Sequence, residues 1–218
     1  MRKWRNLIFT VAVGLLVLAA TGAFATSVPV TNPSFETLPP GGLPFSCGAG
    51  CSWDEGPIPG WMNSGTSGQF QPGSYFNYVP DGVTVAYTNN APIYQIVGTV
   101  SAGTTYTLNV DIGVRTNDST DTPGVGGLLI GSTFLAATGT TPTLGNWSDY
   151  TLTYTALPSA AGQQLGIELQ FGGSGQGDFD NVRLDATADS PVPEPSSLLL
   201  LGTGLLGGIG ALRRKLHL

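Results

Sequence analysis

Carboxylates are the main groups that could do chemistry in this sequence, because histidine and lysine are almost absent. The only histidine is His217, and no lysine lies between Lys3 and Lys215. A serine or cysteine nucleophile activated by histidine is therefore excluded. A carboxylate pair of the kind that glycosidases use is what remains. The acidic candidates are Glu36, Asp54, Glu55, Glu168, Asp178 and Asp180. Their spacing singles out no acid and no base, so we expect a protein that is not an enzyme.

Asp178 and Asp180 have the spacing to share a cation. They lie two positions apart on a strand-like stretch, so both side chains are expected on one face. Ca²⁺ is the natural ion, because it takes roughly six to eight oxygen ligands and accepts loop carbonyls beside carboxylates. The alternative is that Asp180 and Asn181 cap a turn into the last strand.

Aromatic side chains gather in a loop-rich stretch, where their flat faces could stack on sugar rings. Trp53, Tyr75 and Tyr78 have glycine and serine neighbours that would leave them exposed, and Asn77 offers a polar partner. We predict these four residues as ligand-binding. Trp61 follows a Pro-Gly turn, and we expect it in the core instead.

The middle of the chain is strongly acidic. From Glu36 to Glu194 it has all fourteen acidic residues and only two basic ones, Arg115 and Arg183, a net charge of −12. Such a charge repels phosphate backbones and anionic lipid headgroups. Nucleic acid is therefore not expected as a partner.

Residues 1–25 have the parts of a signal peptide. A basic start is followed by an apolar run over residues 7–20 and by Ala23-Phe24-Ala25, which matches an A-x-A cleavage site. We predict cleavage by signal peptidase before Thr26. The alternative, an uncleaved signal anchor, is disfavoured because the apolar run is short for a membrane span.

The C-terminus has three parts in a fixed order. Pro193-Glu194-Pro195 is followed by fifteen apolar and small residues, 198–212, and then by Arg213, Arg214 and Lys215. As a helix, the apolar part would reach about 22 Å, against a hydrocarbon core of about 30 Å. It could span a membrane only with flanking residues or local thinning. The basic end is expected on the cytoplasmic side, with the acidic middle outside.

Residues 192–215 resemble the PEP-CTERM sorting tail, which exosortases read in Gram-negative bacteria that make extracellular polysaccharide. The resemblance implies processing near Pro193 to Pro195 by an exosortase, after an inner-membrane-anchored intermediate with a transmembrane-like helix. A plain C-terminal membrane anchor would explain the apolar run and the arginine pair, but not Pro-Glu-Pro.

Cys47 and Cys51 are predicted to form a disulfide, because export takes the chain into an oxidising compartment. A redox centre usually spaces its cysteines by two residues, and a zinc site would need two more ligands. A loop this short gains little from chain entropy, so the bridge is expected to shape the segment before Trp53.

Short alternating segments between turn residues predict an all-β fold. No stretch after Thr26 keeps a helical period over three turns. Strands are expected at residues 83–88, 93–97, 104–114, 127–136, 149–155, 164–171 and 179–184. Seven strands with frequent turns predict a single antiparallel β-sandwich.

Motifs in this sandwich resemble the galactose-binding-like jelly rolls of many carbohydrate-binding modules. They lie at residues 32–36, 58–61, 102–111, 147–156 and 179–184. The resemblance implies a jelly roll over nearly the whole mature chain. It also implies a structural Ca²⁺ that links the N-terminal loop to the last strand, which points to Glu36 and Asp180, with Asp178 beside them.

Three parts are therefore predicted: a signal peptide (1–25), a jelly-roll domain (26–188) and a PEP-CTERM tail (189–218). We expect an exported, non-catalytic protein of the cell surface or extracellular matrix that binds extracellular polysaccharide. A structural matrix module without a sugar site and a carboxylate-based glycosidase are the open alternatives.

Overall fold

The computed structural model describes residues 24–117, 122–173, 175–188 and 195–216. Residues 24–188 belong to one compact unit, and residues 195–216 lie outside it. The predicted signal peptide lies outside the described residues, apart from its last two positions.

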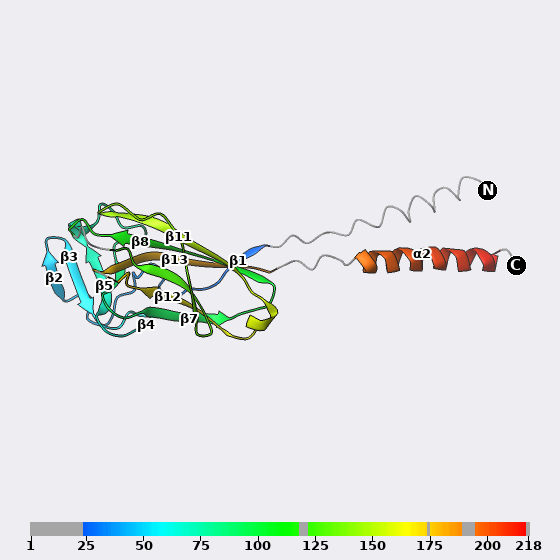
Figure 1. Ribbon diagram of the computed structural model, residues 1–218, viewed down its shortest axis with the longest axis horizontal. Coiled ribbons are helices and arrows are strands. Elements are labelled where there is room, and N and C mark those ends of the chain that lie inside the picture. The colour runs from blue at the N-terminus through cyan, green and yellow to red at the C-terminus, as the bar shows by residue number, and fades with distance from the viewer. Residues whose placement is uncertain (1–23, 118–121, 174, 189–194, 217–218) are drawn as a thin grey trace. The chain divides into compact units, whose positions relative to one another are not determined.

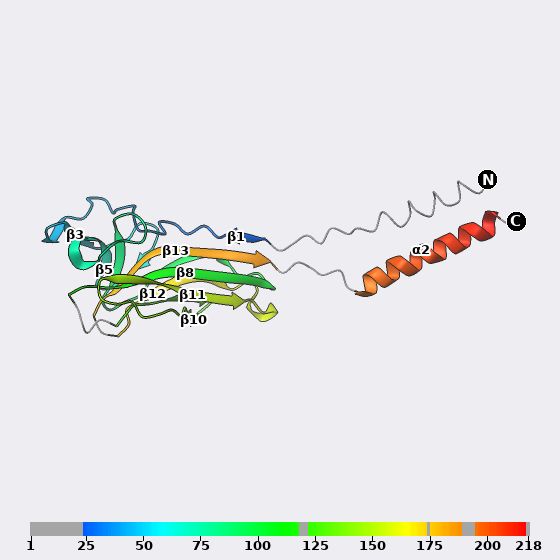
Figure 2. The ribbon, with the colours of Figure 1, turned by 90° about the horizontal axis from the view of Figure 1, so that it is seen from above.

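The compact unit is a sandwich of two antiparallel sheets, as predicted (Figures 1 and 2). The first sheet has the strand order β11-β8-β13-β6-β5-β3-β2. In addition, β1 pairs with the C-terminal part of β13. The second sheet has the order β10-β9-β12-β7-β4. Figure 2 looks onto the first sheet, in which β1, β13, β8 and β11 lie side by side.

The strands of the first sheet are β1 (Ala25–Ser27), β2 (Phe45–Gly48), β3 (Cys51–Glu55), β5 (Ser67–Pro72), β6 (Val85–Thr88), β8 (Thr104–Val114), β11 (Asn146–Thr155) and β13 (Gly177–Ala188). Those of the second are β4 (Met62–Asn63), β7 (Ile93–Thr99), β9 (Val125–Ile130), β10 (Thr133–Ala136) and β12 (Gln164–Gln170). Two short 3-10 helices complete the unit, η1 (Gly73–Tyr75) and η2 (Pro158–Ala160).

The core lies between the sheets and follows the strand alternation. On β8, every second residue from Thr104 to Val110 is buried. Leu108, Val110 and Ile112 belong to one buried cluster with Leu128 and Ile167 of the facing sheet. Alternation of this kind is what a strand with one buried face requires. Trp61 belongs to the same cluster, packs on Phe35 at 5.4 Å between ring centroids, and is 6% exposed. Its predicted core position is confirmed.

One predicted strand is wrong. The segment 127–136 is a hairpin of β9 and β10, in which Thr133 pairs with Ile130. The turn between them contains Gly131, whose φ of 61° is in the left-handed region that glycine adopts at little cost. A two-residue turn keeps the alternation nearly in phase, so the pattern did not reveal the break.

The C-terminal segment forms a helix, α2 (Pro195–Leu216), which begins at the last residue of Pro-Glu-Pro and includes Arg213 and Arg214. Pro193 and Glu194 lie outside the described residues. Within the part of the chain that the structure describes, no helix is long and apolar enough to cross a membrane, so the predicted transmembrane helix is not found.

Candidate functional site

The register of the first sheet brings distant residues into rows on its outer face. Glu55 of β3 lies opposite Gly68 of β5, Gly68 lies opposite Tyr87 of β6, and Tyr87 lies opposite Asp178 of β13. In the neighbouring row, Trp53 lies opposite Phe70. Because side chains two positions apart on a strand share a face, these rows place both sets of side chains on the same surface.

A second apolar cluster forms on this outer face, separate from the core between the sheets. We call it the outer cluster; its buried members are Phe70, Phe76, Val85, Tyr87 and Trp147. Phe76 packs on Trp147 at 4.4 Å between ring centroids, and Phe70 meets Tyr87 edge-on at 5.7 Å. The segment that follows β5 therefore covers one part of the face, while Trp53 and Tyr75 are only half-buried at its margin.

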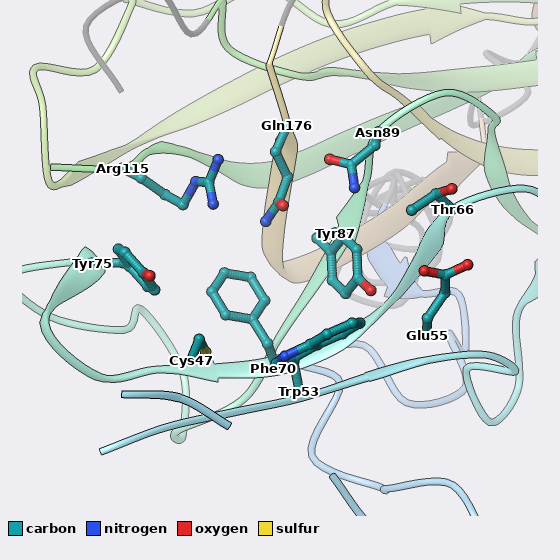
Figure 3. A pocket seen from close by; sticks show the side chains of 10 residues that line it. All are labelled: Cys47, Trp53, Glu55, Thr66, Phe70, Tyr75, Tyr87, Asn89, Arg115 and Gln176. Atoms are coloured by element: carbon teal, nitrogen blue, oxygen red, sulfur yellow. The ribbon is translucent and has the colours of Figure 1, made fainter. Parts of the chain in front are cut away.

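An open recess of about 250 Å³ lies beside the outer cluster, and we call it the aromatic recess. This volume is near the lower end of ligand pockets, which run from about 300 to 1,000 Å³. Figure 3 shows aromatic side chains in its middle, with Arg115 and Tyr75 toward one end and Glu55 and Thr66 toward the other. Its lining residues are Cys47, Trp53, Glu55, Thr66, Phe70, Tyr75, Tyr87, Asn89, Arg115 and Gln176.

Arg115 joins the recess to the buried carboxylate of Asp178. The guanidinium lies 5.7 Å from the centre of the Tyr75 ring, and Nε lies 3.9 Å from Oδ2 of Asp178. The side-chain amide of Gln176 donates to Oδ1 of Asp178 at 2.7 Å. Since a buried charge is stable only when it is paired and hydrogen-bonded, these contacts hold Arg115 and Gln176 in place at the recess.

The predicted disulfide between Cys47 and Cys51 is present, with a Cα–Cα distance of 5.2 Å. It closes the β2–β3 hairpin, in which Phe45 lies opposite Trp53 and packs on it at 4.8 Å between ring centroids. The bridge thus lies beside Trp53, the position for which it was predicted, and Cys47 itself lines the recess.

The four predicted ligand-binding residues divide into two pairs. Trp53 and Tyr75 line the aromatic recess. Asn77 and Tyr78 instead border another surface depression, together with residues that include Gly50 and Val83. Asn77 donates to the Asn146 side chain at 3.1 Å, so it fastens the covering segment to β11.

The predicted calcium ligands also divide. Glu36 accepts backbone N–H groups of Val83 and Thr84 at 2.8 and 2.7 Å, and Asp180 accepts that of Asp81 at 2.9 Å. Both therefore hold the same turn before β6, whereas Asp178 contacts Gln176 and Arg115.

No cluster of three or more acidic, cysteine or histidine side chains that could hold a metal ion occurs among the described residues. Calcium therefore stays a prediction.

Asp180 lies at a bulge within β13 rather than at a turn before it. The register with β8 shifts between Asp180 and Arg183, and Asn181 adopts a φ of 49°. The next residue, Val182, donates to the Pro33 carbonyl at 2.9 Å, so the bulge attaches the last strand to the N-terminal loop. Complete burial raises the pKa of Asp180 to about 8, although two backbone N–H groups favour its charged form.

Several residues of the recess have no signal in the sequence. Tyr87 lies in the predicted strand 83–88. None of the predicted strands contains Phe70, Asn89, Arg115 or Gln176. They meet only because β3, β5, β6 and β13 are neighbours in the sheet. The one available hint was that Arg115 is one of two basic residues in an acidic stretch.

Comparisons with known proteins concern the sandwich and the C-terminal tail separately. No curated protein sequence matches it. Three solved structures that resemble it are carbohydrate-active or carbohydrate-binding proteins. The CBM22-1 xylan-binding domain of Paenibacillus barcinonensis Xyn10C is 10% identical, with a TM-score of 0.44 over 79% of this chain and 99% of that one.

The CBM22-1–GH10 modules of Clostridium thermocellum xylanase 10B, complexed with xylohexaose, are 15% identical, with a TM-score of 0.44. That match covers 61% of this chain but only 27% of the xylanase chain. The N-terminal cellulose-binding domain of Cellulomonas fimi β-1,4-glucanase C is 21% identical, with a TM-score of 0.28 over 66% of this chain and 96% of that one. At these values the likeness assigns no ligand to this chain.

Family models identify both parts of the sequence. The PEP-CTERM protein-sorting motif matches residues 191–215, which confirms the predicted sorting tail. The model of the HpiC1-like family, described as HpiC1 cyclase, matches residues 26–185. This range runs from β1 into the last strand, β13. The chain therefore belongs to the HpiC1-like family.

Proposed function

We propose that this protein is a non-catalytic polysaccharide binder of the cell surface or extracellular matrix, and that it binds through the aromatic recess. The observation that carries the proposal is the recess itself, in which Trp53 and Tyr75 are half-buried beside polar groups. The PEP-CTERM motif indicates export and exosortase-mediated surface sorting, so such a recess would meet extracellular polymers.

The lining of the recess suits a sugar chain on chemical grounds. Sugar rings offer apolar C–H faces that stack on aromatic rings, and their hydroxyl groups need hydrogen-bond partners. Trp53, Phe70 and Tyr87 supply the aromatic surface, while Thr66 and Asn89 supply polar groups at its margin. Four of the ten lining residues are aromatic. Ligand sites commonly combine such aromatic surface with polar groups that orient the ligand.

The finer steps of sorting are part of the same proposal. Signal peptidase would cleave before Thr26, and an exosortase would cut near Pro193 to Pro195 while the tail holds the chain at the inner membrane. Mass spectrometry of the mature protein from its host tests both steps. A mature chain that starts at Thr26 and ends near Val192 supports them, and a chain that retains residues 198–212 contradicts the second.

Binding is tested by affinity electrophoresis of the purified chain in a panel of soluble polysaccharides. We expect Trp53→Ala and Tyr75→Ala to abolish the retardation that the unmodified chain shows. Tyr78→Ala is the matched control, because Tyr78 is 52% exposed and lies outside the recess. Equal retardation of all variants would place binding elsewhere, and no retardation in any polymer would favour a structural matrix module.

Absence of catalysis is the second part of the proposal. The family description names a cyclase, and two carboxylates, Glu55 and Asp178, lie at or beside the recess. A non-catalytic binder should nevertheless leave bound oligosaccharides unchanged after prolonged incubation, as checked by mass spectrometry. Cyclised or hydrolysed products that disappear in Glu55→Gln or Asp178→Asn would overturn it.

A further inference from the structure

The charges around the aromatic recess define the class of sugar that it can take, and this step rests on the proposed binding function. The chain has a net charge of −12 between Glu36 and Glu194. Among the Lys and Arg residues in this stretch, Arg183 bonds to Asp149 at 3.0 Å and is not part of the recess lining. Arg115 is thus the single basic residue of the lining.

Arg115 offers little net positive charge to a ligand. Its guanidinium already lies over the Tyr75 ring at 5.7 Å, and Asp178, which is completely buried, lies 3.9 Å away. An acidic sugar that approached this end would compete with a carboxylate that is fixed beneath it. Uronic acid units are therefore disfavoured at the recess.

The opposite end of the recess is negative and aromatic. Glu55 is exposed there and lies two positions from Trp53 on β3, so both side chains are on one face. Tyr87 stands in the same register row as Glu55, with Gly68 between them. Burial, with Glu55 and Asp54 nearby, raises the pKa of its hydroxyl. The negative potential of these carboxylates thus reaches the aromatic wall.

A carboxylate beside the half-buried ring of Trp53 in an open recess is an arrangement that attracts an ammonium group. The π-face draws a cation electrostatically, and a partly exposed carboxylate adds an ion pair. Neutral sugars would use the aromatic surface alone. An amino sugar would use the surface and both charge interactions.

We propose that the Glu55 end of the aromatic recess binds the ammonium group of an amino sugar, so that the preferred ligand is a polysaccharide with free hexosamine units. The ammonium lies between the Glu55 carboxylate and the faces of Trp53 and Tyr87. Thr66 and Asn89, at the same end, bind the neighbouring hydroxyl groups (Figure 3).

The test compares two oligosaccharides that differ only at their amino groups, which are free and charged in one and N-acetylated and neutral in the other. A glucosamine hexasaccharide and its fully N-acetylated form are titrated calorimetrically into the purified chain at mildly acidic pH and about 0.15 M salt, which screens distant surface charges. We expect the free amine to bind about tenfold more tightly, the middle of the range for one cation–π contact with an exposed ion pair.

Glu55→Gln should remove most of this preference, so that the ratio of the two dissociation constants falls towards one. Glu168→Gln is the matched control, because it makes the same charge change on β12 in the other sheet. A preference that falls equally in both variants would show a general attraction to an acidic domain and would overturn the proposal.

The outcomes also separate this inference from the proposed function. Equal or tighter binding of the N-acetylated form, or of a glucuronate oligosaccharide, overturns the amino-sugar preference while polysaccharide binding stands. Failure of every oligosaccharide and polymer to bind overturns both.

Discussion

Removal of the Cys47–Cys51 disulfide should lower both the stability of the domain and the affinity of the recess. The bridge joins residues four apart in sequence. In the chain-entropy model, closing a loop of about five residues stabilises the folded state by about 2 kcal/mol at 25 °C. For a domain of this size, about 2 kcal/mol corresponds to a Tm change of about 4–8 °C.

The structure adds a local effect to this global one. Cys51 is buried on the inner edge of the hairpin, and Cys47 lines the recess. The bridge holds β2 against β3, and Phe45 of β2 supports Trp53 at 4.8 Å. Without the bridge this edge of the sheet should fray first, because β2 has a partner on one side only.

The assay compares the oxidised chain, the chain with reductant, and the variant Cys47→Ala/Cys51→Ala by calorimetry. Reductant removes the covalent link without changing side-chain volume, so it separates loop closure from packing. The double variant should melt near the reduced chain, and reductant should leave its Tm unchanged. Affinity for the bound polysaccharide should weaken in parallel.

Two results would refute this reasoning. A Tm that reductant changes by less than about 1 °C would mean that the folded hairpin does not depend on the bridge. A lower Tm with unchanged affinity would mean that the bridge stabilises the domain without positioning Trp53.

Three further predictions concern the scaffold. Trp61→Ala should cost about 3–5 kcal/mol in urea unfolding, because the side chain is buried on Phe35; a cost below about 1 kcal/mol would contradict its core role. The free energy of unfolding should fall as pH rises from about 4 to about 8, by up to about 1.4 kcal/mol per pH unit. The reason is that the Asp180 carboxyl ionises in the unfolded chain, whereas in the folded chain its raised pKa keeps it protonated. Asp180→Asn should flatten this slope, and an equal slope in the variant would assign it to other groups. Gly113→Ala should destabilise by about 1–3 kcal/mol, since a Cβ there would lie 2.8 Å from a ring carbon of the outer cluster, whereas Gly98→Ala, with open space around it, should be nearly neutral; equal effects would refute the packing argument.

Local patterns were sufficient where a segment is long or covalently defined. The alternation in β8 predicted the bounds Thr104–Val114 that the structure shows, because one face of that strand is buried along its length. Cysteine spacing with an export signal predicted the disulfide, and a Pro-Gly turn before Trp61 was consistent with a core residue.

Short strands escaped the same analysis. The strands β1 to β5 have two to six residues each, and turn residues and proline interrupt them, so their alternation is too brief to recognise. Long-range hydrogen bonds also escape a local analysis. The backbone N–H of Val182 donates to the carbonyl of Pro33, about 150 positions earlier. Such pairings depend on the register of the whole sheet.

The sequence by itself determined the C-terminal sorting motif of this protein and the class of its fold. Targeting segments are read as linear chains, and the sandwich follows from period-two burial, so both are encoded locally. Only the tertiary structure decided the recess, because Glu55, Tyr87 and Asp178 become neighbours through hydrogen-bond register between β3, β5, β6 and β13. A one-residue slip in that register would turn each side chain to the opposite face, and no local pattern fixes it.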